Sequence, residues 1–566
     1  MDSFIEESDG KQIIHVWPIK IQTVTGVPDG RAPTIWQRKA CLLSPISNTR
    51  RIGFINSRIR RDFVEREPAN RCMVLGRLVN PEKLVSGIRQ GYEASMGSLM
   101  SGLFSLISNG HENQLLGWSG DGHIITVAPT RSGKGVGLVV PNLLHYPGSV
   151  LVIDPKGENY AITADFRRKM FRQEIICLDP FHVMTEETDS INPLDSLVDY
   201  RKPTSTYLTQ NPELGDIAAN IADAMIVRDA GAKDPHWDDK ARTLLRGLIL
   251  AVICGKGPHR LRHLSEVREL LAQPFHVIGN FILDSMCQDK VAVGGLLSRA
   301  GNEILSTGNE ELKSIISNAL KHTEFLDSGL ACKSLGDMND GGIGTYDLAD
   351  LKSIGGVSIY MIIPPQYLVR YSRLIRLWIT MAMSAMTRSS RKPADGCPVL
   401  FMLDEMAQLG SLPMMKQAVS LLAGYGMSIW MVWQDLSQLK ALYEHDWPTF
   451  LANAKIQQFF GINDHETAKY ISEMLGRTIT SKSVSHSQSG KFTEFVKNKS
   501  ESESFSEITR NLLKSGRSSS PESRSCAHFR PGYSSHSGER LTYYSDHMFS
   551  GKASSNPYFS NNLTRK

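Results

Sequence analysis

The segment from Ala128 to Gly135, APTRSGKG, constrains the fold more strongly than any other part of this 566-residue chain. It follows an apolar run typical of a strand, HIITVA, and precedes a helical pattern, GVGLVVPNLL. In a P-loop, G-x-x-x-x-G-K-[ST], the loop between a strand and a helix holds phosphates with its backbone N–H groups, and its lysine reaches the terminal phosphates. We therefore predict a phosphate-binding loop made of Thr130, Arg131, Ser132, Gly133, Lys134, Gly135 and Val136.

Two positions depart from this motif. Ala128 stands in place of the first glycine, and Gly135 stands in place of the hydroxyl residue that would bind Mg²⁺. A Ser-Gly-Lys-Gly sequence also occurs in ordinary loops, so the prediction needs support from other parts of the chain.

Strand-like and helical segments alternate on both sides of a long helical region. The strand patterns are 123–128, 149–154 and 174–179 before it, and 357–364, 399–405, 428–434 and 455–462 after it. Helical patterns over 159–171 and 367–389 lie between strands. This alternation is typical of an α/β fold with a parallel-type central sheet and helices on both faces.

The region between the two sets of strands, from about 212 to 326, has apolar residues at helical spacing and no strand-like run. One sheet domain interrupted by an all-α domain is the simplest organisation. After about Thr480 serine dominates and apolar periodicity is lost, which predicts a flexible tail. The predicted divisions are a weakly defined N-terminal region (1–112), a nucleotide-binding domain in two parts (113–205 and 330–479), the all-α domain (206–329) and the tail (480–566).

Two further strand ends carry polar groups that suit nucleotide chemistry. VLFMLDE ends in Asp404 and Glu405, and SIWMVWQ ends in Gln434. The carboxyl ends of parallel strands share one edge of a sheet, where ligands of open α/β folds bind. We predict that Asp404 holds Mg²⁺, that Glu405 activates the attacking water and that Gln434 senses the γ-phosphate. The alternatives are two solvated acids at a strand end and a glutamine that merely starts a turn.

The loop DPKGEN, residues 154–159, follows another strand at the same predicted edge of the sheet. Its polar groups could converge on the phosphates, or Glu158 or Asn159 could cap the following helix.

Cysteine usage and hydropathy bear on the compartment. The eight cysteines are scattered, with no C-x-x-C and no Cys/His cluster at zinc spacing, which predicts a reducing compartment and argues against a structural metal. The N-terminus lacks a signal-peptide pattern. Of two long uncharged stretches, 417–434 is interpreted as core and 94–111 as an amphipathic helix, so no confident membrane span is predicted.

The small net charge of +5 hides an uneven distribution. Residues 50–77 hold eight basic and three acidic residues, and the tail from Thr480 holds 13 basic and 7 acidic residues. The rest of the chain is therefore mildly acidic. The two basic segments suit sequence-independent contact with a phosphate backbone or a membrane surface, or they are simply solvated surface.

A set of ordered motifs resembles the TraG/TraD-type coupling protein ATPases of type IV secretion and bacterial conjugation. The resemblance runs from about Gln114 to Gly476. It is carried by APTRSGKGVGLVVPNLL, GSVLVIDPKGENYAITADFRR, LDPF, INPL, DPHWDDKARTLLRGLIL, LFMLDEMAQLG and WQDLSQLKALY.

The resemblance implies a RecA-like P-loop nucleotide-binding domain interrupted by an all-α domain, with ATP and Mg²⁺ bound between the subunits of a homo-hexamer. Lys134 would be the Walker A lysine, Asp404 and Glu405 the Walker B pair, and Gln434 the sensor. A neighbouring subunit would supply an arginine finger, for which Arg373 and Arg376 are candidates or else solvated helix positions.

The resemblance also implies a function. Such a motor recruits DNA as a relaxase–DNA complex, or effector proteins, and delivers them to secretion-channel proteins at the cytoplasmic face of the bacterial inner membrane. Family members usually begin with two transmembrane helices, which this sequence does not show, so a peripheral or cytoplasmic location is the alternative. The segment ERLTYYSDHMFSGK (539–552) resembles the C-terminal segment of the family.

Two other functions stay open from the sequence. Gly135 and the absent anchor would also suit a nucleotide-binding docking adaptor with little ATP turnover. A related DNA-pumping ATPase outside secretion is the third hypothesis.

Overall fold

A computed structural model describes two main parts of the chain: residues 121–475, except 195–210, 212, 228–235, 338, 340–341 and 354, and residues 541–558. It also describes the backbone of strands at 3–8, 11–16, 52–55, 73–78, 115–118, 477–489, 500–511, 525–529 and 536–539. The predicted helix over 94–111 lies outside these residues, and so does most of the basic segment 50–77.

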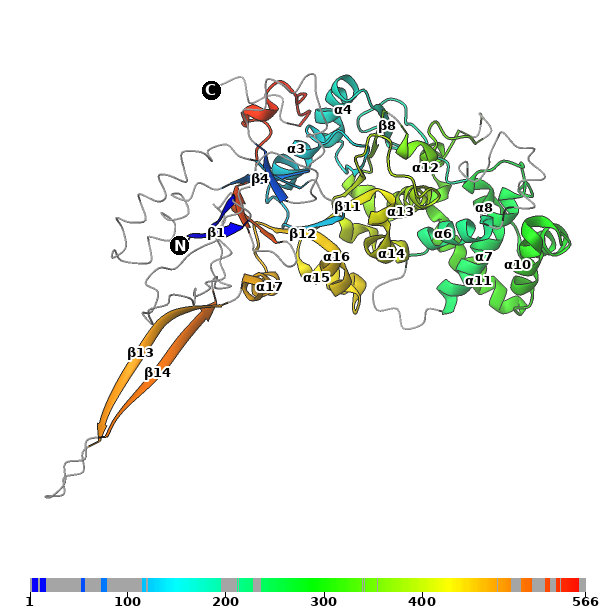
Figure 1. The fold of residues 1–566 in the computed structure, drawn as a ribbon. Helices are drawn as coiled ribbons and strands as arrows, with labels where there is room; N and C mark the ends of the chain where they lie inside the picture. Colours follow the sequence, from blue (N-terminus) through cyan, green and yellow to red (C-terminus); the bar gives the residue numbers. More distant parts are fainter. Residues whose placement is uncertain are drawn as a thin grey trace.

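Seven parallel strands form the centre of the fold (Figure 1). Most of them are runs of apolar residues, and their residues are largely buried, as expected for a sheet covered on both faces. The predicted α/β class with a parallel central sheet is therefore confirmed. In spatial order the strands are β12 (Ala454–Phe459), β6 (His123–Val127), β11 (Met427–Trp433), β10 (Val399–Leu403), β7 (Val150–Ile153), β9 (Val357–Met361) and β8 (Glu174–Leu178).

Helices connect successive strands of this sheet. The P-loop leads into η3 (Gly135–Val139) and α3 (Val140–Leu143), α4 (Glu158–Met170) joins β7 to β8, and α13 (Pro365–Thr387) joins β9 to β10. After β10 come η10 (Met406–Leu409), α14 (Pro413–Leu421) and η11 (Leu422–Tyr425). The uncharged stretch 417–434 is thus part helix and part central strand, as predicted. The remaining connections are α15 (Leu436–Tyr443), α16 (Trp447–Asn453) and α17 (His465–Leu475).

Between β8 and β9 the chain leaves the sheet, and the regular elements of its described residues are all helices, which lie at one end of the molecule (Figure 1). Because β8 and β9 are hydrogen-bonded neighbours, this helical segment begins and ends at one point of the sheet. Its described elements are α6 (Leu214–Met225), α7 (His236–Ile253), α8 (Leu264–Leu271), α9 (Phe275–Phe281), η5 (Ile282–Cys287), η6 (Ala292–Gly295), α10 (Leu296–Leu305), α11 (Asn309–Thr323), η7 (Glu324–Asp327), α12 (Gly329–Lys333) and η9 (Leu348–Lys352).

The core has one large cluster on each face of the sheet. Alternate residues of β6 point to opposite faces, so Ile125 joins the cluster that continues into the helical segment, whereas Ile124 joins the cluster beneath α3. The first cluster runs without a break from the strands to Leu245 of α7. The helical segment therefore shares a hydrophobic core with the sheet.

Five antiparallel strands extend the sheet beyond β12, and they come from both ends of the chain. Their order is β15 (Ser525–Phe529), β16 (His536–Glu539), β4 (Met73–Leu78), β5 (Leu115–Trp118) and β3 (Ile52–Ile55). Two separate hairpins are β1 (Ser3–Ser8) with β2 (Lys11–Val16), and β13 (Arg477–Ser489) with β14 (Ser500–Asn511). Figure 1 shows the second hairpin projecting away from the rest of the chain.

Two parts of the predicted flexible tail pack against the rest of the chain. β15 pairs with the central strand β12, and residues 541–558 pack on α3 and α4. The apolar residues responsible, Leu541, Tyr543 and Phe549, lie in an irregular segment, so they leave no periodic signal in the sequence.

No helix in the described part of the chain is both long enough and apolar enough to cross a bilayer.

Candidate functional site

The P-loop turns tightly between β6 and its helix. Arg131 and Gly133 have φ of 64° and 85°, in the left-handed region that reverses the chain. The amide of Ser132 donates to the carbonyl of Pro129 over 3.2 Å, and the amide of Gly137 donates to that of Gly133 over 2.9 Å. The helix therefore begins at the predicted glycine-lysine pair, and the N–H groups of its first turn, which have no intrahelical acceptor, lie at the loop.

Lys134 lies against both predicted acidic residues. β10 ends at Leu403, and Asp404 and Glu405 follow it directly. Lys134 Nζ is 3.4 Å from Asp404 Oδ1 and 3.4 Å from Glu405 Oε1. Only 8% of the lysine side chain is exposed, so these contacts are shielded from solvent more than a surface ion pair is.

The strand order explains how Gln434 reaches the same place. β11 lies between β6 and β10, so the residue after β11 lies between the P-loop and the acidic pair. Gln434 Nε2 donates to Glu405 Oε2 over 2.9 Å. The structure thus brings Lys134, Asp404, Glu405 and Gln434 into one cluster.

Glu405 has a φ of 59° and a ψ of 41°, which is left-handed backbone. A residue with a β-carbon rarely adopts this conformation, and such strain is concentrated at functional sites. The turn ends β10 and starts η10, and it holds the Glu405 carboxylate between Lys134 and Gln434.

Burial has the largest effect on the pKa of two carboxyl groups at this edge of the sheet. It raises the pKa of Asp404, and the nearby Lys134 ammonium opposes that shift. Burial also raises the pKa of Asp154, at the end of β7, to about 7, although its carboxylate accepts a hydrogen bond from the Tyr160 amide over 2.8 Å. Asp154 thus accepts a hydrogen bond from the first turn of α4, whereas the N-cap residue of that helix is Gly157 and has no side-chain cap.

The loop has features that fit a nucleotide. Ser132 Oγ is buried and has no hydrogen-bond partner among the described residues, so a phosphate oxygen would satisfy it. No heavy atom lies within 4 Å of the position that a β-carbon on Gly135 would take. This open space lies where the P-loop hydroxyl normally binds Mg²⁺. Asp404 remains the predicted Mg²⁺ ligand, and carboxylate oxygen is the donor that this cation prefers.

Neither arginine-finger candidate suits that role within this chain. The guanidinium of Arg376 is wholly buried and donates to five backbone carbonyls. Arg373 Nε donates to the Met225 carbonyl, and its Nη2 lies 3.4 Å from His322 Nδ1. The prediction of Arg376 as a finger or as a solvated position is wrong, because its guanidinium is buried and hydrogen-bonded to backbone carbonyls of the same chain. Its acceptors are the carbonyls of Asp223, Ala224, Ile226, Leu409 and Ser411.

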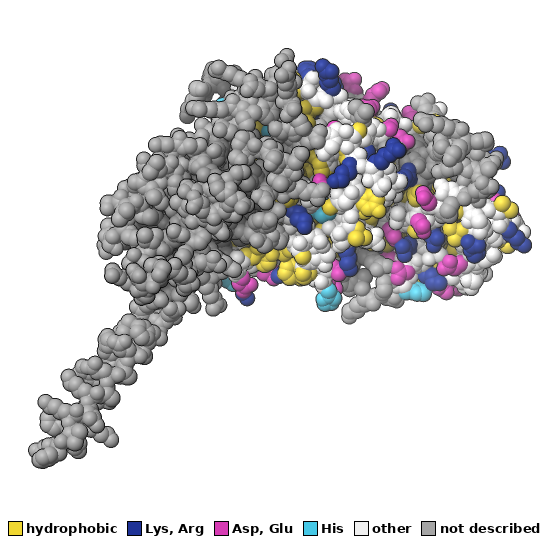
Figure 2. Space-filling view, in the orientation of Figure 1, with side chains coloured by type: hydrophobic (Ala, Val, Ile, Leu, Met, Phe, Trp, Pro, Cys, Tyr) yellow, Lys and Arg dark blue, Asp and Glu magenta, His cyan; other side chains and the backbone are white. Residues whose placement is uncertain are grey.

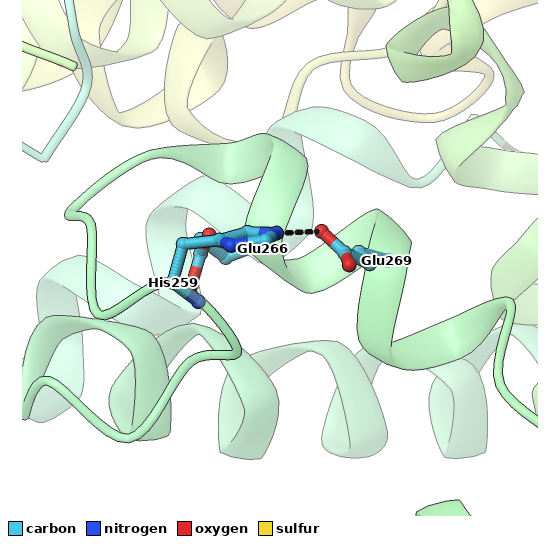
Figure 3. Close-up of side chains that lie close together, drawn as sticks. All are labelled: His259, Glu266 and Glu269. Atoms are coloured by element: carbon cyan, nitrogen blue, oxygen red, sulfur yellow. Dashed lines mark hydrogen bonds and ion pairs between the residues drawn. The ribbon is translucent and has the colours of Figure 1, made fainter. Parts of the chain in front are cut away.

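A second group of polar side chains lies in the helical segment (Figure 3). His259 Nε2 is 2.9 Å from Glu269 Oε2, and the amide of His259 donates to Glu266 Oε2 over 2.9 Å. Ligand atoms of the three residues lie within 4.8 Å of one another. The contacts tie the loop before α8 to that helix, which accounts for the cluster without a metal.

Acidic and basic side chains are interspersed over the helical segment on the face shown in Figure 2. This face of the described residues carries no continuous basic stripe of the kind that nucleic-acid backbones favour. The structure describes few of the side chains in the segments predicted to be basic.

Residues 541–558 contact the first turn after the P-loop and the turn after β7, and the sequence analysis assigns them no role. The Tyr543 amide donates to the Val136 carbonyl over 3.3 Å, and Tyr558 Oη donates to the Lys156 carbonyl over 2.9 Å. The only sequence signal was the motif ERLTYYSDHMFSGK, which carried no information about its contacts.

Comparison with known proteins gives a consistent result. The family model for conjugative DNA transfer by type IV secretory systems matches residues 106–565. A conjugal transfer protein TraG of Escherichia coli is 29% identical over 465 residues, covering 77% of this chain and 69% of its own length. Protein VirD4 of Rhizobium radiobacter is 30% identical over 385 residues, covering 65% of this chain and 50% of its own length.

Solved structures of the conjugative coupling protein TrwB share the fold. One has a TM-score of 0.53 at 14% identity, covering 74% of this chain and 85% of the other. Others, at a TM-score of 0.52, hold TrwB in complex with ADP and Mg²⁺ or with a non-hydrolysable ATP analogue. At this identity the likeness concerns the RecA-like fold alone.

Proposed function

This chain belongs to the family of type IV secretion coupling proteins for conjugative DNA transfer, and we propose that it works there as an ATP-driven motor. The observation that carries the proposal is the convergence of Lys134, Asp404, Glu405 and Gln434 at one edge of the sheet. A lysine, two carboxylates and an amide at the phosphate loop are the groups that ATP hydrolysis needs.

We assign roles to these residues from their positions. The N–H groups of residues 131–136 and the Lys134 ammonium hold the β- and γ-phosphates. Glu405 orients the attacking water and accepts its proton, and Gln434 holds the Glu405 carboxylate in place. Mg²⁺ held by Asp404 would neutralise charge that develops on the phosphates.

The wider setting is also a proposal. By family membership the motor acts on DNA without sequence preference, on a relaxase–DNA complex or on effector proteins, and it engages secretion-channel proteins as a homo-hexamer. We place it at the cytoplasmic face of the inner membrane, with peripheral attachment as the alternative.

A nucleotide-binding docking adaptor with little turnover is the second candidate. Gly135 favours it, because the loop offers no side-chain hydroxyl at the position that usually binds Mg²⁺.

Nucleotide binding and hydrolysis by the purified full chain test both functions. We expect Lys134→Ala to lose binding of a non-hydrolysable ATP analogue. We expect Glu405→Gln to retain binding and to lose about 100- to 10,000-fold in turnover with DNA present. Lys416→Ala is the matched control, because this lysine is exposed and pairs with Asp446.

The two candidates predict different results. Turnover that is unchanged in Lys134→Ala would contradict the motor. Analogue binding with negligible wild-type turnover, together with retained DNA transfer in cells carrying Glu405→Gln, would support the adaptor instead.

A further inference from the structure

Residues 541–558, named here the C-terminal clip, lie on the outer side of the two helices nearest the nucleotide loop (Figure 1, red). Leu541, Tyr543 and Phe549 of the clip are buried. They pack in one cluster with Val140 and Leu144, which follow the P-loop, and with Ile162 of α4. Their burial holds the clip in place through apolar contact with these helices, about 400 residues along the chain from the P-loop.

Hydrogen bonds fix the clip at three points, each on a different element. The Tyr543 amide donates to the Val136 carbonyl in the first turn after the P-loop, over 3.3 Å. The Ser554 amide donates to the Ile162 carbonyl of α4 over 3.0 Å. Tyr558 Oη donates to the Lys156 carbonyl, in the turn between β7 and α4, over 2.9 Å.

One of these points lies in the predicted phosphate-binding loop, and another lies in the turn that follows β7 at the same edge of the sheet. Val136 is in the predicted phosphate-binding loop, next to Gly135. Lys156 is in the turn that begins with Asp154, where the Gly157 amide donates to the Asp154 carbonyl over 3.1 Å. The clip therefore connects the P-loop helix and the 154–157 turn from outside the sheet.

We propose that the C-terminal clip is a positioning element of the nucleotide site, in which Tyr558 holds the 154–157 turn in its binding geometry relative to the P-loop helix. This inference rests on the proposed nucleotide binding. It adds residues 541–558, near the C-terminal end of the chain, to the residues around Lys134 that form the nucleotide site.

Thermodynamic linkage gives the proposal a measurable consequence. We call the clip closed when it makes the contacts described above. If the closed clip raises nucleotide affinity, bound nucleotide must stabilise the closed clip by the same factor. The Tyr543 and Ser554 amides, both hydrogen-bonded to the helices, report closure through their hydrogen exchange with solvent. A clip that only covers apolar surface would not respond to nucleotide.

The experiment is hydrogen exchange on the full chain with and without a non-hydrolysable ATP analogue and Mg²⁺. We expect the analogue to slow exchange in peptides covering 541–558 by about 3–10-fold in the wild type. No such slowing is expected in Lys134→Ala. If the analogue binds, as shown separately by calorimetry, and exchange in 541–558 stays the same, the proposal is overturned.

A matched pair of tyrosines isolates the hydroxyl contact. Tyr558→Phe removes only the donor to Lys156, and we expect it to raise the analogue Kd about 2–10-fold, the range that one hydrogen bond supplies. We expect the midpoint of unfolding without nucleotide to stay at the wild-type value, because Tyr558 is exposed. Tyr544→Phe, at a side chain 65% exposed in the same clip, should change neither quantity.

The outcomes are distinguishable. Equal analogue affinity in Tyr558→Phe and Tyr544→Phe would overturn the role of Tyr558. A wild-type chain that fails to bind the analogue would overturn the proposed nucleotide function itself, and the role of the clip with it.

Discussion

The side-chain amide of Gln434 donates to Glu405 Oε2 over 2.9 Å, and the other oxygen of that carboxylate lies 3.4 Å from Lys134 Nζ. Both carboxylate oxygens are thus engaged, one by the residue after β11 and one by the P-loop lysine. A bound γ-phosphate would compete for Lys134 and leave Oε1 free to accept a proton from water. Gln434 would then keep the carboxylate oriented.

We expect Gln434→Leu to lower turnover more than nucleotide binding. The substitution removes a hydrogen bond to a charged group, worth about 1.5–3 kcal/mol, so turnover should fall about 10–100-fold. The Kd of a non-hydrolysable analogue should change less than about 3-fold, since Lys134 and the loop amides remain. Gln408→Leu, at an exposed position in η10, is the control. A parallel loss of affinity and turnover would assign Gln434 to binding instead.

Gly135→Thr should supply the missing P-loop hydroxyl. Apart from the adjoining residues and the backbone of the same helix, no heavy atom lies within 4 Å of the β-carbon position, so a β-carbon meets no other part of the chain. We expect the Mg²⁺ concentration for half-maximal hydrolysis to fall about 3–10-fold, because the threonine hydroxyl would add one oxygen ligand to the cation. Gly133→Ala is the contrasting variant, because φ of 85° at Gly133 strains any residue with a β-carbon. An unchanged Mg²⁺ requirement in Gly135→Thr would count against an Mg²⁺ ligand at this position.

Arg376→Met should destabilise the fold. The guanidinium of this α13 residue binds carbonyls at the end of α6 and after η10, and these acceptors would lose their partners in a buried place. We expect a loss of at least about 3 kcal/mol in the free energy of unfolding by urea. Arg370→Met, in the same helix but in an exposed pair with Glu324, should change it by less than about 1 kcal/mol. Lost turnover with unaltered stability in Arg376→Met would restore this residue as an arginine finger.

The raised pKa of Asp154 should make the free energy of unfolding depend on pH. Below pH 4 its carboxyl is neutral in the folded and unfolded states. Between about 4 and its folded pKa of about 7 only the folded state keeps the proton, so stability falls as the pH rises through this window. Asp154→Asn should remove this dependence and stabilise the nucleotide-free protein at pH 8 by up to about 4 kcal/mol. Urea unfolding at pH 5 and pH 8 measures it, and an equal pH slope in both proteins would refute it.

Much of the sheet could be predicted because its information is local. Strands buried on both faces are continuous apolar runs between turns, so β6, β7, β10 and β11 were found within one or two residues of their observed ends. The site residues were predictable for a related reason. Lys134, Asp404 and Gln434 each follow a parallel strand, and parallel strands place their carboxyl ends at one edge.

Contacts between distant segments were not predictable in this way. Arg376 was misjudged because backbone carbonyls, which are its partners, exist at every residue and leave no pattern in the sequence. β15 pairs with β12 through Gln457 and Phe529, about 70 residues apart, and pairing of this kind depends on the assembled sheet.

Apolar periodicity and motif spacing are local properties, so the fold class, the order of the strands along the chain and the chemistry available at the phosphate loop can be read from the sequence. Only the tertiary structure decided the spatial order β6, β11, β10, which puts Gln434 between the loop and Glu405. It also decided that Arg376 is structural and that the C-terminal clip lies on the P-loop helix. The physical reason is that side-chain partners are chosen by packing in three dimensions, which no local pattern encodes.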